Sequence, residues 1–195
     1  MVSILVIGDT HIPDRAEKVP EELLDIIESG KPWDVAVFTG DFTSKEVFDW
    51  FTRLGRQVYY VRGNMDYLPL PKTQTFRIES LAFGVHHGDG IYPRGDTRGL
   101  TRIAKNLKVD VLISGHTHSL FIKTSIDGSI LLLNPGSLTG VWGGGGGSMR
   151  PSMMILEVAE NMMKITRYEL SIEPRKPDTY LSKYVFKENN RWIKQ

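Results

Sequence analysis

The sequence predicts an α/β fold that begins with a parallel sheet and continues with antiparallel strands. In the first half, short runs rich in Val, Ile and Phe alternate with amphipathic segments of helical period, which is the pattern of β-α-β units. The second half contains strand-like runs joined by turn residues such as Asp127-Gly128, which are typical of hairpins. Polar residues able to bind a metal follow most of the predicted buried strands. We therefore expect one site at the carboxyl edge of a sheet, where open α/β sheets bind ligands.

The expected elements follow from apolar periodicity and from the turn residues at their ends. The first helix, for example, begins with Pro20 and two glutamates and stops before Gly30. In the first half we predict strands at 3–7, 34–39 and 57–62, separated by helices at 20–28 and 44–54. In the second half we predict hairpins at 74–79 with 81–85 and at 120–126 with 129–133, a helix at 97–108, a strand at 110–114, and a strand pair at 152–158 and 162–170.

The composition restricts the classes of function. A chain of 195 residues, 41% hydrophobic and 24% charged, has the size and balance of one domain with a real core. No apolar run reaches the ~20 residues of a membrane span, and the N-terminus lacks the basic region of a signal peptide, so we expect a cytoplasmic protein. The net charge of +1 gives no strong signal for nucleic-acid binding. Because cysteine is absent, any metal must be held by His, Asp, Glu or Asn.

The first predicted strand ends at Gly8, and Asp9 and His11 follow it. Side chains two positions apart in an extended segment point the same way, so we expect this carboxylate and this imidazole to converge beyond the strand. An oxygen donor and a nitrogen donor aimed at one point suit a divalent transition metal. The alternative is a structural role, in which Asp9 caps the turn and His11 binds backbone.

Further donors follow the later predicted strands. His116 and His118 repeat the two-residue spacing after the strand at 110–114. The whole set is too large for one closed tetrahedral site, and it fits two metals that share a bridging carboxylate. The predicted metal ligands are Asp9, His11, Asp41, Asn64, His87, His116 and His118.

Five motifs occur in one order along the chain: Asp-x-His, Gly-Asp, Gly-Asn-x-Asp, His-Gly-Asp and Gly-His-Thr-His. With them the chain resembles the calcineurin-like metallophosphoesterases, and most closely their small single-domain phosphodiesterase branch, which also contains a retromer subunit of the same fold. The resemblance covers residues 1–172 and implies a four-layer αββα sandwich, two mixed β-sheets packed face to face with helices on the outer faces. Residues 173–195 are expected to be a basic C-terminal extension, packed on the domain or at a subunit contact.

The resemblance implies a dinuclear metal-dependent phosphoesterase that prefers phosphodiesters to monoesters. A metal-bridging hydroxide would attack phosphorus in line with the leaving oxygen. The first metal would be held by Asp9, His11 and His118, the second by Asn64, His87 and His116, with Asp41 bridging them. The expected catalytic residues are Asp41, Asn64 and His116, and Asn64 and Arg15 are expected to contact substrate. Mn²⁺ is the first choice of metal, although Ni²⁺, Fe²⁺, Co²⁺ and Zn²⁺ suit the same donors.

One position departs from the family pattern. Met65 stands after the Gly-Asn pair, where many relatives carry a histidine that is thought to protonate the leaving group or to position the phosphate. Methionine cannot donate a proton, so the sequence favours esters with good leaving groups, or protonation by water or another residue.

Several weaker candidates have structural alternatives. His86 is expected to be a core or supporting group, while Asp66 and Asp89 either orient ligands or cap turns. Arg62 and Arg150 either contact phosphate or lie on the surface. The segment 142–148, with Trp142 and five glycines, is either a lid or a surface loop.

The expected partner is a phosphoester small molecule or a nucleotide-derived substrate. The alternative function is a non-catalytic or weakly catalytic scaffold of the same fold. The segment from Pro174 to Gln195 carries six basic and two acidic residues, and it is the expected contact in a homo-oligomer. Its apolar residues suit one face of a helix: Tyr180, Leu181, Tyr184 and Val185.

Overall fold

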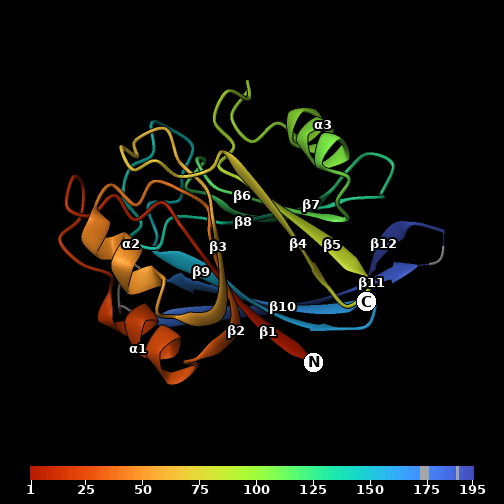
Figure 1. Cartoon of the computed structure of the whole chain (residues 1–195), viewed down its shortest axis with the longest axis horizontal. Helices are drawn as coiled ribbons and strands as arrows, with labels where there is room; N and C mark the ends of the chain where they lie inside the picture. Colours follow the sequence, from red (N-terminus) through yellow and green to blue (C-terminus); the bar gives the residue numbers. More distant parts are fainter. Residues whose placement is uncertain (172–175, 188) are drawn as a thin grey trace.

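In the part of the chain that the structure describes, two β-sheets pack face to face at the centre, and three helices lie on their outer faces (Figure 1). The computed structural model describes residues 1–171, 176–187 and 189–195. The helices are α1 (Glu21–Ser29), α2 (Lys45–Phe51) and α3 (Thr97–Leu107). The strands are β1 (Val2–Ile7), β2 (Trp33–Phe38), β3 (Gly55–Tyr60), β4 (Thr73–Ile78), β5 (Leu81–His86), β6 (Val111–Ser114), β7 (Leu120–Thr124), β8 (Leu131–Pro135), β9 (Ser152–Ala159), β10 (Met162–Leu170), β11 (Pro177–Lys187) and β12 (Arg191–Lys194).

Both sheets are mixed. The larger has the order β12-β11-β10-β9-β1-β2-β3, and the smaller has the order β4-β5-β6-β8-β7. Strands β1, β2 and β3 run parallel in the first sheet, as do β5, β6 and β8 in the second. Because parallel strands end at the same edge, the loops after β1, β2 and β3 meet there, and those after β5 and β6 meet at the corresponding edge of the second sheet.

The buried side chains form three layers of contact. Between the sheets, Val6 and Val37 belong to the same apolar cluster as Val85 and Ile113. Each such side chain stabilises the fold by about 1.5–3 kcal/mol when it leaves water. Outside the larger sheet, Leu23 and Ile27 of α1 and Phe51 of α2 pack on β1 and β2; outside the smaller sheet, Leu100 and Ala104 of α3 pack on β6 and β8. The predicted four-layer αββα sandwich is confirmed.

Side-chain caps explain where two of the helices begin. The Ser44 hydroxyl accepts a hydrogen bond from the backbone of Val47, and the Asp96 carboxylate accepts one from Gly99. Such caps satisfy amide groups that have no partner within the helix. The helix predicted at 44–54 ends earlier, at Phe51, because the backbone closes into a turn in which Leu54 donates to Phe51.

The C-terminal segment is not helical. Strand β11 pairs antiparallel with β10 from Met162↔Val185 to Leu170↔Pro177, and β12 pairs with β11. Tyr184 and Trp192 face the core between the sheets, whereas Leu181 and Ile193 are exposed. The helical interpretation is therefore wrong: alternation along a strand, with a period of two, decides which side chains are buried. The predicted boundary between residues 172 and 173 falls outside the described residues.

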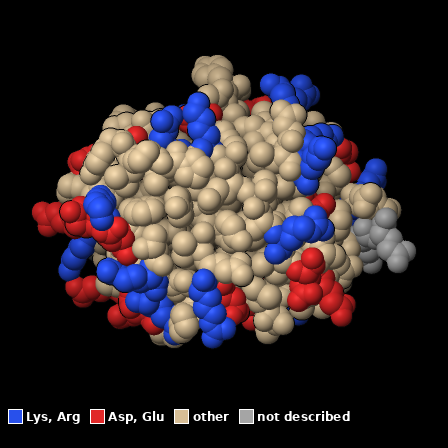
Figure 2. All heavy atoms as spheres, viewed as in Figure 1, with Lys and Arg blue, Asp and Glu red and all other residues tan. Residues whose placement is uncertain are grey.

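The surface carries charges of both signs. On the face in Figure 2, Lys and Arg side chains lie among Asp and Glu side chains around the rim. Several of them pair, for example Lys45 with Asp49 and Lys105 with Asp127. Among the described residues, no helix is long and apolar enough to cross a bilayer.

Candidate metal centre

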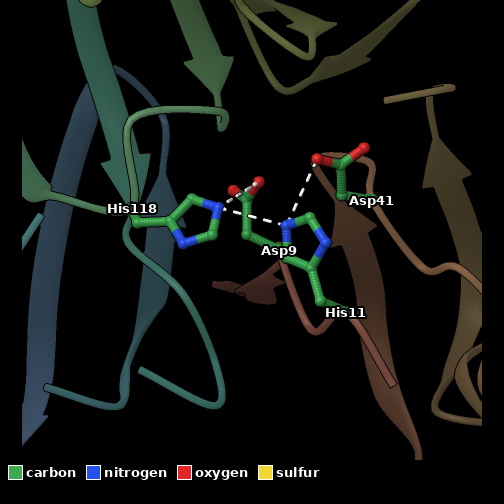
Figure 3. Close-up of side chains that lie close together, drawn as sticks. All are labelled: Asp9, His11, Asp41 and His118. Atoms are coloured by element: carbon green, nitrogen blue, oxygen red, sulfur yellow. Dashed lines mark hydrogen bonds and ion pairs between the residues drawn. The ribbon is translucent and has the colours of Figure 1, made fainter. Parts of the chain in front are cut away.

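Four side chains from distant parts of the sequence point toward one another where the two sheets meet (Figure 3). Asp9 and His11 follow β1, Asp41 follows β2, and His118 follows β6 of the other sheet. Their ligand atoms all lie within 4.8 Å of one another, and all four residues are buried. His11 Nε2 lies 3.3 Å from Asp41 Oδ2, and His118 Nε2 lies 3.4 Å from Asp9 Oδ1. The predicted first site is therefore brought together in the folded chain.

The other three predicted ligands adjoin this group. His87 Nε2 lies 3.1 Å from Asn64 Oδ1 and 3.4 Å from Asp41 Oδ2. The rings of His87 and His116 meet edge to face, with centroids 5.0 Å apart. Asp41 Oδ2 thus lies within 3.4 Å of imidazole nitrogens from both predicted ligand sets.

Five of the seven predicted ligands have a positive φ, which is rare for residues other than glycine. The values are 50° for Asp9, 48° for His11, 60° for Asp41, 68° for His116 and 53° for His118. The side chains of Asp9 and His11 therefore converge through a left-handed turn, and the extended geometry expected from their spacing is wrong. Left-handed backbone at several non-glycine residues is costly and clusters at functional sites.

Asp66 holds the turn that carries Asp41. One of its carboxylate oxygens accepts hydrogen bonds from the backbones of Asp41 (2.9 Å) and Gly63 (2.8 Å), and the other accepts one from Thr43 (3.0 Å). A Cβ at Gly63 would lie 2.0 Å from Asp41 Oδ1, so only glycine fits beside this carboxylate. The backbone of Met65 donates to that same Oδ1 at 2.8 Å. Asp66 is thus a structural support of the candidate ligand.

A second set of contacts holds Asp9. The backbone of His116 donates to both of its carboxylate oxygens, at 3.2 and 3.0 Å. The Ser137 hydroxyl donates to the Asp9 carbonyl at 2.7 Å, and the Asn134 amide donates to the Gly115 carbonyl at 2.7 Å. The Asn134-Pro135-Gly136-Ser137 motif therefore links the loops after β1 and β6.

The contacts of the imidazoles leave ligand nitrogens facing the centre. His118 Nδ1 lies 2.7 Å from the Val141 carbonyl, and His87 Nδ1 lies 2.8 Å from the Thr39 carbonyl. Because a carbonyl only accepts, each Nδ1 carries a proton, which leaves Nε2 as the nitrogen that binds a cation once it gives up its own proton. Two imidazole nitrogens and two carboxylate oxygens converge on the first site, a donor set that fits a divalent transition metal.

The electrostatics favour the charge states that bind metal at three positions. Burial lowers the pKa of His11 to about 4 against the opposing charges of Asp41 and Asp9, and burial followed by the nearby His87 lowers the pKa of His116 to about 4. Burial acts to raise the pKa of Asp41, but the hydrogen bond and charge of His87, together with the Met65 amide and the charge of His11, outweigh it and bring this pKa to about 2. At neutral pH both imidazoles are therefore neutral and the carboxylate is ionised.

His87 and His118 respond in the opposite direction. Burial acts to lower the pKa of His87, but the hydrogen bond with Asp41 and the charge of Asp9 outweigh it and raise this pKa to about 9. Burial is likewise outweighed at His118, where Asp9 raises the pKa. Both imidazoles thus respond to the negative charge of the carboxylates that surround them.

The structure gives the surroundings of four weaker candidates from the sequence. His86 Nδ1 accepts a hydrogen bond from Gly88 at 2.8 Å. Arg150 pairs with Glu169 at 3.0 Å and with Asp178 at 2.6 Å. Arg62 and Asp89 are exposed.

Two arginines near the centre bind the backbone of the segment that follows Leu138. Arg15 donates from Nη1 to the Trp142 carbonyl at 2.9 Å, and its contact with substrate stays a prediction. Arg94 bonds to the carbonyls of His116 and Gly143 and was missed in the sequence. Tyr92-Pro93-Arg94-Gly95 has the composition of an ordinary turn, so no sequence signal distinguishes this arginine.

The chain is similar to known phosphoesterases and to solved structures of Vps29. Residues 2–161 match the calcineurin-like phosphoesterase superfamily domain. A probable metallophosphoesterase from Methanocaldococcus jannaschii is 47% identical over 134 residues, which are 69% of this chain and 67% of that protein.

Two solved structures extend the similarity over more of the chain. Wild-type Vps29 from Entamoeba histolytica, complexed with Zn²⁺, is 33% identical with a TM-score of 0.82, covering 92% of this chain and 99% of that one. Chaetomium thermophilum Vps29, complexed with a cyclic peptide, is 27% identical with a TM-score of 0.77, covering 93% and 95%. Because the domain match spans most of the chain and carries the ligand motifs, the protein belongs to the calcineurin-like phosphoesterase superfamily.

Proposed function

We propose that the protein is a dinuclear metal-dependent phosphodiesterase. The observation that carries this proposal is the position of Asp41 Oδ2, 3.3 Å from His11 Nε2 and 3.4 Å from His87 Nε2. A carboxylate oxygen within 3.4 Å of imidazole nitrogens from both proposed ligand sets suits a pair of metals ~3.5–4 Å apart, the spacing of two-metal phosphoesterase centres.

We assign the seven predicted ligands to two metals. Asp9, His11 and His118 would hold the first metal, Asn64, His87 and His116 would hold the second, and Asp41 would be shared by both. When bound, the metals supply Lewis acidity and lower the pKa of water, and Mn²⁺ is our first choice among them. Asn64 is exposed at the rim, where its amide can also contact a phosphate oxygen, and Arg15 supplies positive charge nearby.

The leaving group receives no proton from Met65, whose side chain is 42% exposed. This favours diesters whose leaving oxygen is a weak base, such as small-molecule or nucleotide-derived esters with acidic leaving groups. Esters of basic alcohols would react more slowly for the same reason.

The test is hydrolysis of bis-p-nitrophenyl phosphate by metal-stripped protein after addition of Mn²⁺, Ni²⁺, Zn²⁺ or Mg²⁺ separately. Asp41→Asn is expected to lose at least ~100-fold in turnover, more than is typical for loss of a group that only supports a ligand. Asp14→Asn, at an exposed carboxylate that no described hydrogen bond involves, is the matched control and should keep wild-type turnover. Equal turnover in Asp41→Asn and wild type would refute the proposal.

The second candidate is a scaffold that keeps the fold and the metal site without efficient turnover. It is favoured by the similarity to Vps29 over more than nine-tenths of this chain, including the structure with a bound cyclic peptide. The same experiment separates the two functions. Folded wild-type protein that binds two metal ions and hydrolyses no ester with any of them would favour the scaffold.

A further inference from the structure

We propose that Arg94 is a positioning residue of the metal centre, which binds the backbone segment 141–143 against His118 and so fixes that imidazole as a ligand. The proposal rests on the metal-dependent function proposed above and concerns a residue outside the predicted set of metal ligands. Arg94 lies in the loop between β5 and α3, and its guanidinium reaches two other loops.

The guanidinium bridges the backbone of a candidate ligand and the backbone of the glycine-rich loop. Nη2 donates to the His116 carbonyl at 2.5 Å, and Nη1 donates to the Gly143 carbonyl. Two donors in one rigid plane fix the distance between two acceptors, which the single ammonium group of lysine does not do. Arg94 therefore ties the loop after β6 to the segment at 141–143.

Three consecutive carbonyls of this segment accept hydrogen bonds from side chains at the site. His118 Nδ1 bonds to Val141 at 2.7 Å, Arg15 to Trp142 at 2.9 Å, and Arg94 to Gly143. We call these three bonds the clasp. The donors come from three separate loops, so the clasp joins the His11 side of the centre to the His118 side.

Close packing holds the segment against the imidazole. A Cβ added at Gly143 would lie 2.5 Å from Cγ of the His118 ring, so no other residue fits there without a shift. His118 itself is only 3% exposed. Its Nδ1 is bound to the clasp and its Nε2 lies 3.2 Å from His11 Nε2, so the clasp determines where the ligand nitrogen points.

Both terminal nitrogens of the Arg94 guanidinium bind backbone carbonyls, and its Nε is buried with no hydrogen-bond partner among the described residues. We therefore assign Arg94 to holding the ligands and not to binding the substrate. Its removal is expected to weaken metal binding and lower kcat, with KM within about twofold. A residue that bound the phosphate directly would instead raise KM.

The experiment measures Mn²⁺ binding by calorimetry to metal-free wild type, Arg94→Ala and Arg94→Lys, with kcat and KM on bis-p-nitrophenyl phosphate in parallel. Both variants should bind Mn²⁺ about 10–100-fold more weakly, the usual effect of removing a group that orients a ligand. Added guanidinium ion should restore part of the affinity of Arg94→Ala and none of that of Arg94→Lys, whose side chain fills the space. Arg98→Ala, at an exposed position of α3, is the matched control and should bind as wild type does.

A second pair of variants tests the packing alone. Gly143→Ala places a methyl group against the His118 ring, whereas the methyl group of Gly145→Ala would have no atom within 4 Å. Gly145 has a φ of +120°, which strains alanine more than the backbone of Gly143 does. Weaker Mn²⁺ binding in Gly143→Ala than in Gly145→Ala therefore supports the contact, and the reverse order would refute it.

The outcomes separate this proposal from the proposed function. Unchanged Mn²⁺ affinity in folded Arg94→Ala, or a change confined to KM, overturns the positioning role. Wild type that binds Mn²⁺ but hydrolyses no ester refutes the phosphodiesterase, and weaker Mn²⁺ binding by Arg94→Ala would then still support the positioning role.

Discussion

The Nε2 atoms of His11 and His118 lie 3.2 Å apart, although 107 positions separate the two residues in the sequence. His11 follows the first strand of the larger sheet, and His118 follows a strand of the smaller one. Their contact therefore exists only when the two sheets pack face to face. At this distance a proton on one nitrogen is shared with the other, and a cation bound to both would replace that proton.

The stability of the metal-free protein should fall between pH 6.5 and about 9. His87 has a pKa of about 9 in the folded protein against 6.5 for the free side chain, so its contribution is complete below 6.5 and is lost as the pH rises through 9. The raised pKa of His118 acts in the same direction. We expect a loss on the order of 2 kcal/mol.

Urea unfolding of chelator-treated protein at pH 6.5, 7.5 and 9 measures this loss. His11 and His116 act in the opposite direction, because their pKa values are lowered to about 4 and only the unfolded chain still loses their protons above pH 6.5. Each adds less than about 0.5 kcal/mol over this range, so the loss from His87 is larger. A free energy of unfolding that rises from pH 6.5 to 9 would contradict the assigned charge of His87.

Replacing Met65 with histidine should speed the hydrolysis of esters with basic leaving groups. The residue lies beside Asn64 at the exposed rim, so an imidazole there could protonate a leaving oxygen, and such general acid catalysis contributes about 10²-fold at the low end of its usual range. Esters of p-nitrophenol need no proton and should change little. The measurement compares phenyl and p-nitrophenyl diesters, with Met65→Leu as the control. An equal change for both esters would show that the substitution acts on something other than proton transfer.

Asp66→Ala should weaken both the fold and metal binding. The carboxylate accepts from three backbone amides of the loops that carry Asp41 and Gly63. Water replaces some of these bonds because Asp66 is only partly buried, so the expected cost is about 1–3 kcal/mol. Urea unfolding and Mn²⁺ titration measure the two effects, and Asp89→Ala, at an exposed carboxylate, is the control. Stability lost without any loss of Mn²⁺ affinity would show that Asp66 does not orient Asp41.

Trp192→Ala should destabilise the protein by about 3–5 kcal/mol, as truncation of a buried aromatic side chain does. Trp192 is 5% exposed in the core between the sheets, and its indole donates to the Asp110 carbonyl at 3.0 Å. Ile193→Ala changes the neighbouring residue, which is 44% exposed, and should cost less than about 0.5 kcal/mol. Thermal and urea unfolding compare the two variants. A cost below about 1 kcal/mol for Trp192→Ala would make the C-terminal hairpin peripheral to the core.

Local pattern was enough to predict most of the elements. The apolar runs at β1, β2 and β6 are short, rich in branched residues and followed by glycine, and these signals depend only on neighbours in the sequence. The C-terminal segment lacked such a signal. Its Tyr180, Leu181, Tyr184 and Val185 suit either a helix face or an alternating strand. The free edge of β10 selects the strand because it offers unpaired backbone groups.

The sequence by itself determined the class of fold and the list of candidate ligands, because both follow from residue types and their order along the chain. Tertiary structure decided how the ligands meet: the left-handed backbone at Asp9 and His11, the position of Asp41 between two imidazoles, and the contact of Arg94 with segment 141–143. These features depend on the packing of two sheets whose edges come together only in the folded chain. The contacts of Arg94 could not be predicted from the sequence, because the two carbonyls that it binds belong to loops far from it along the chain.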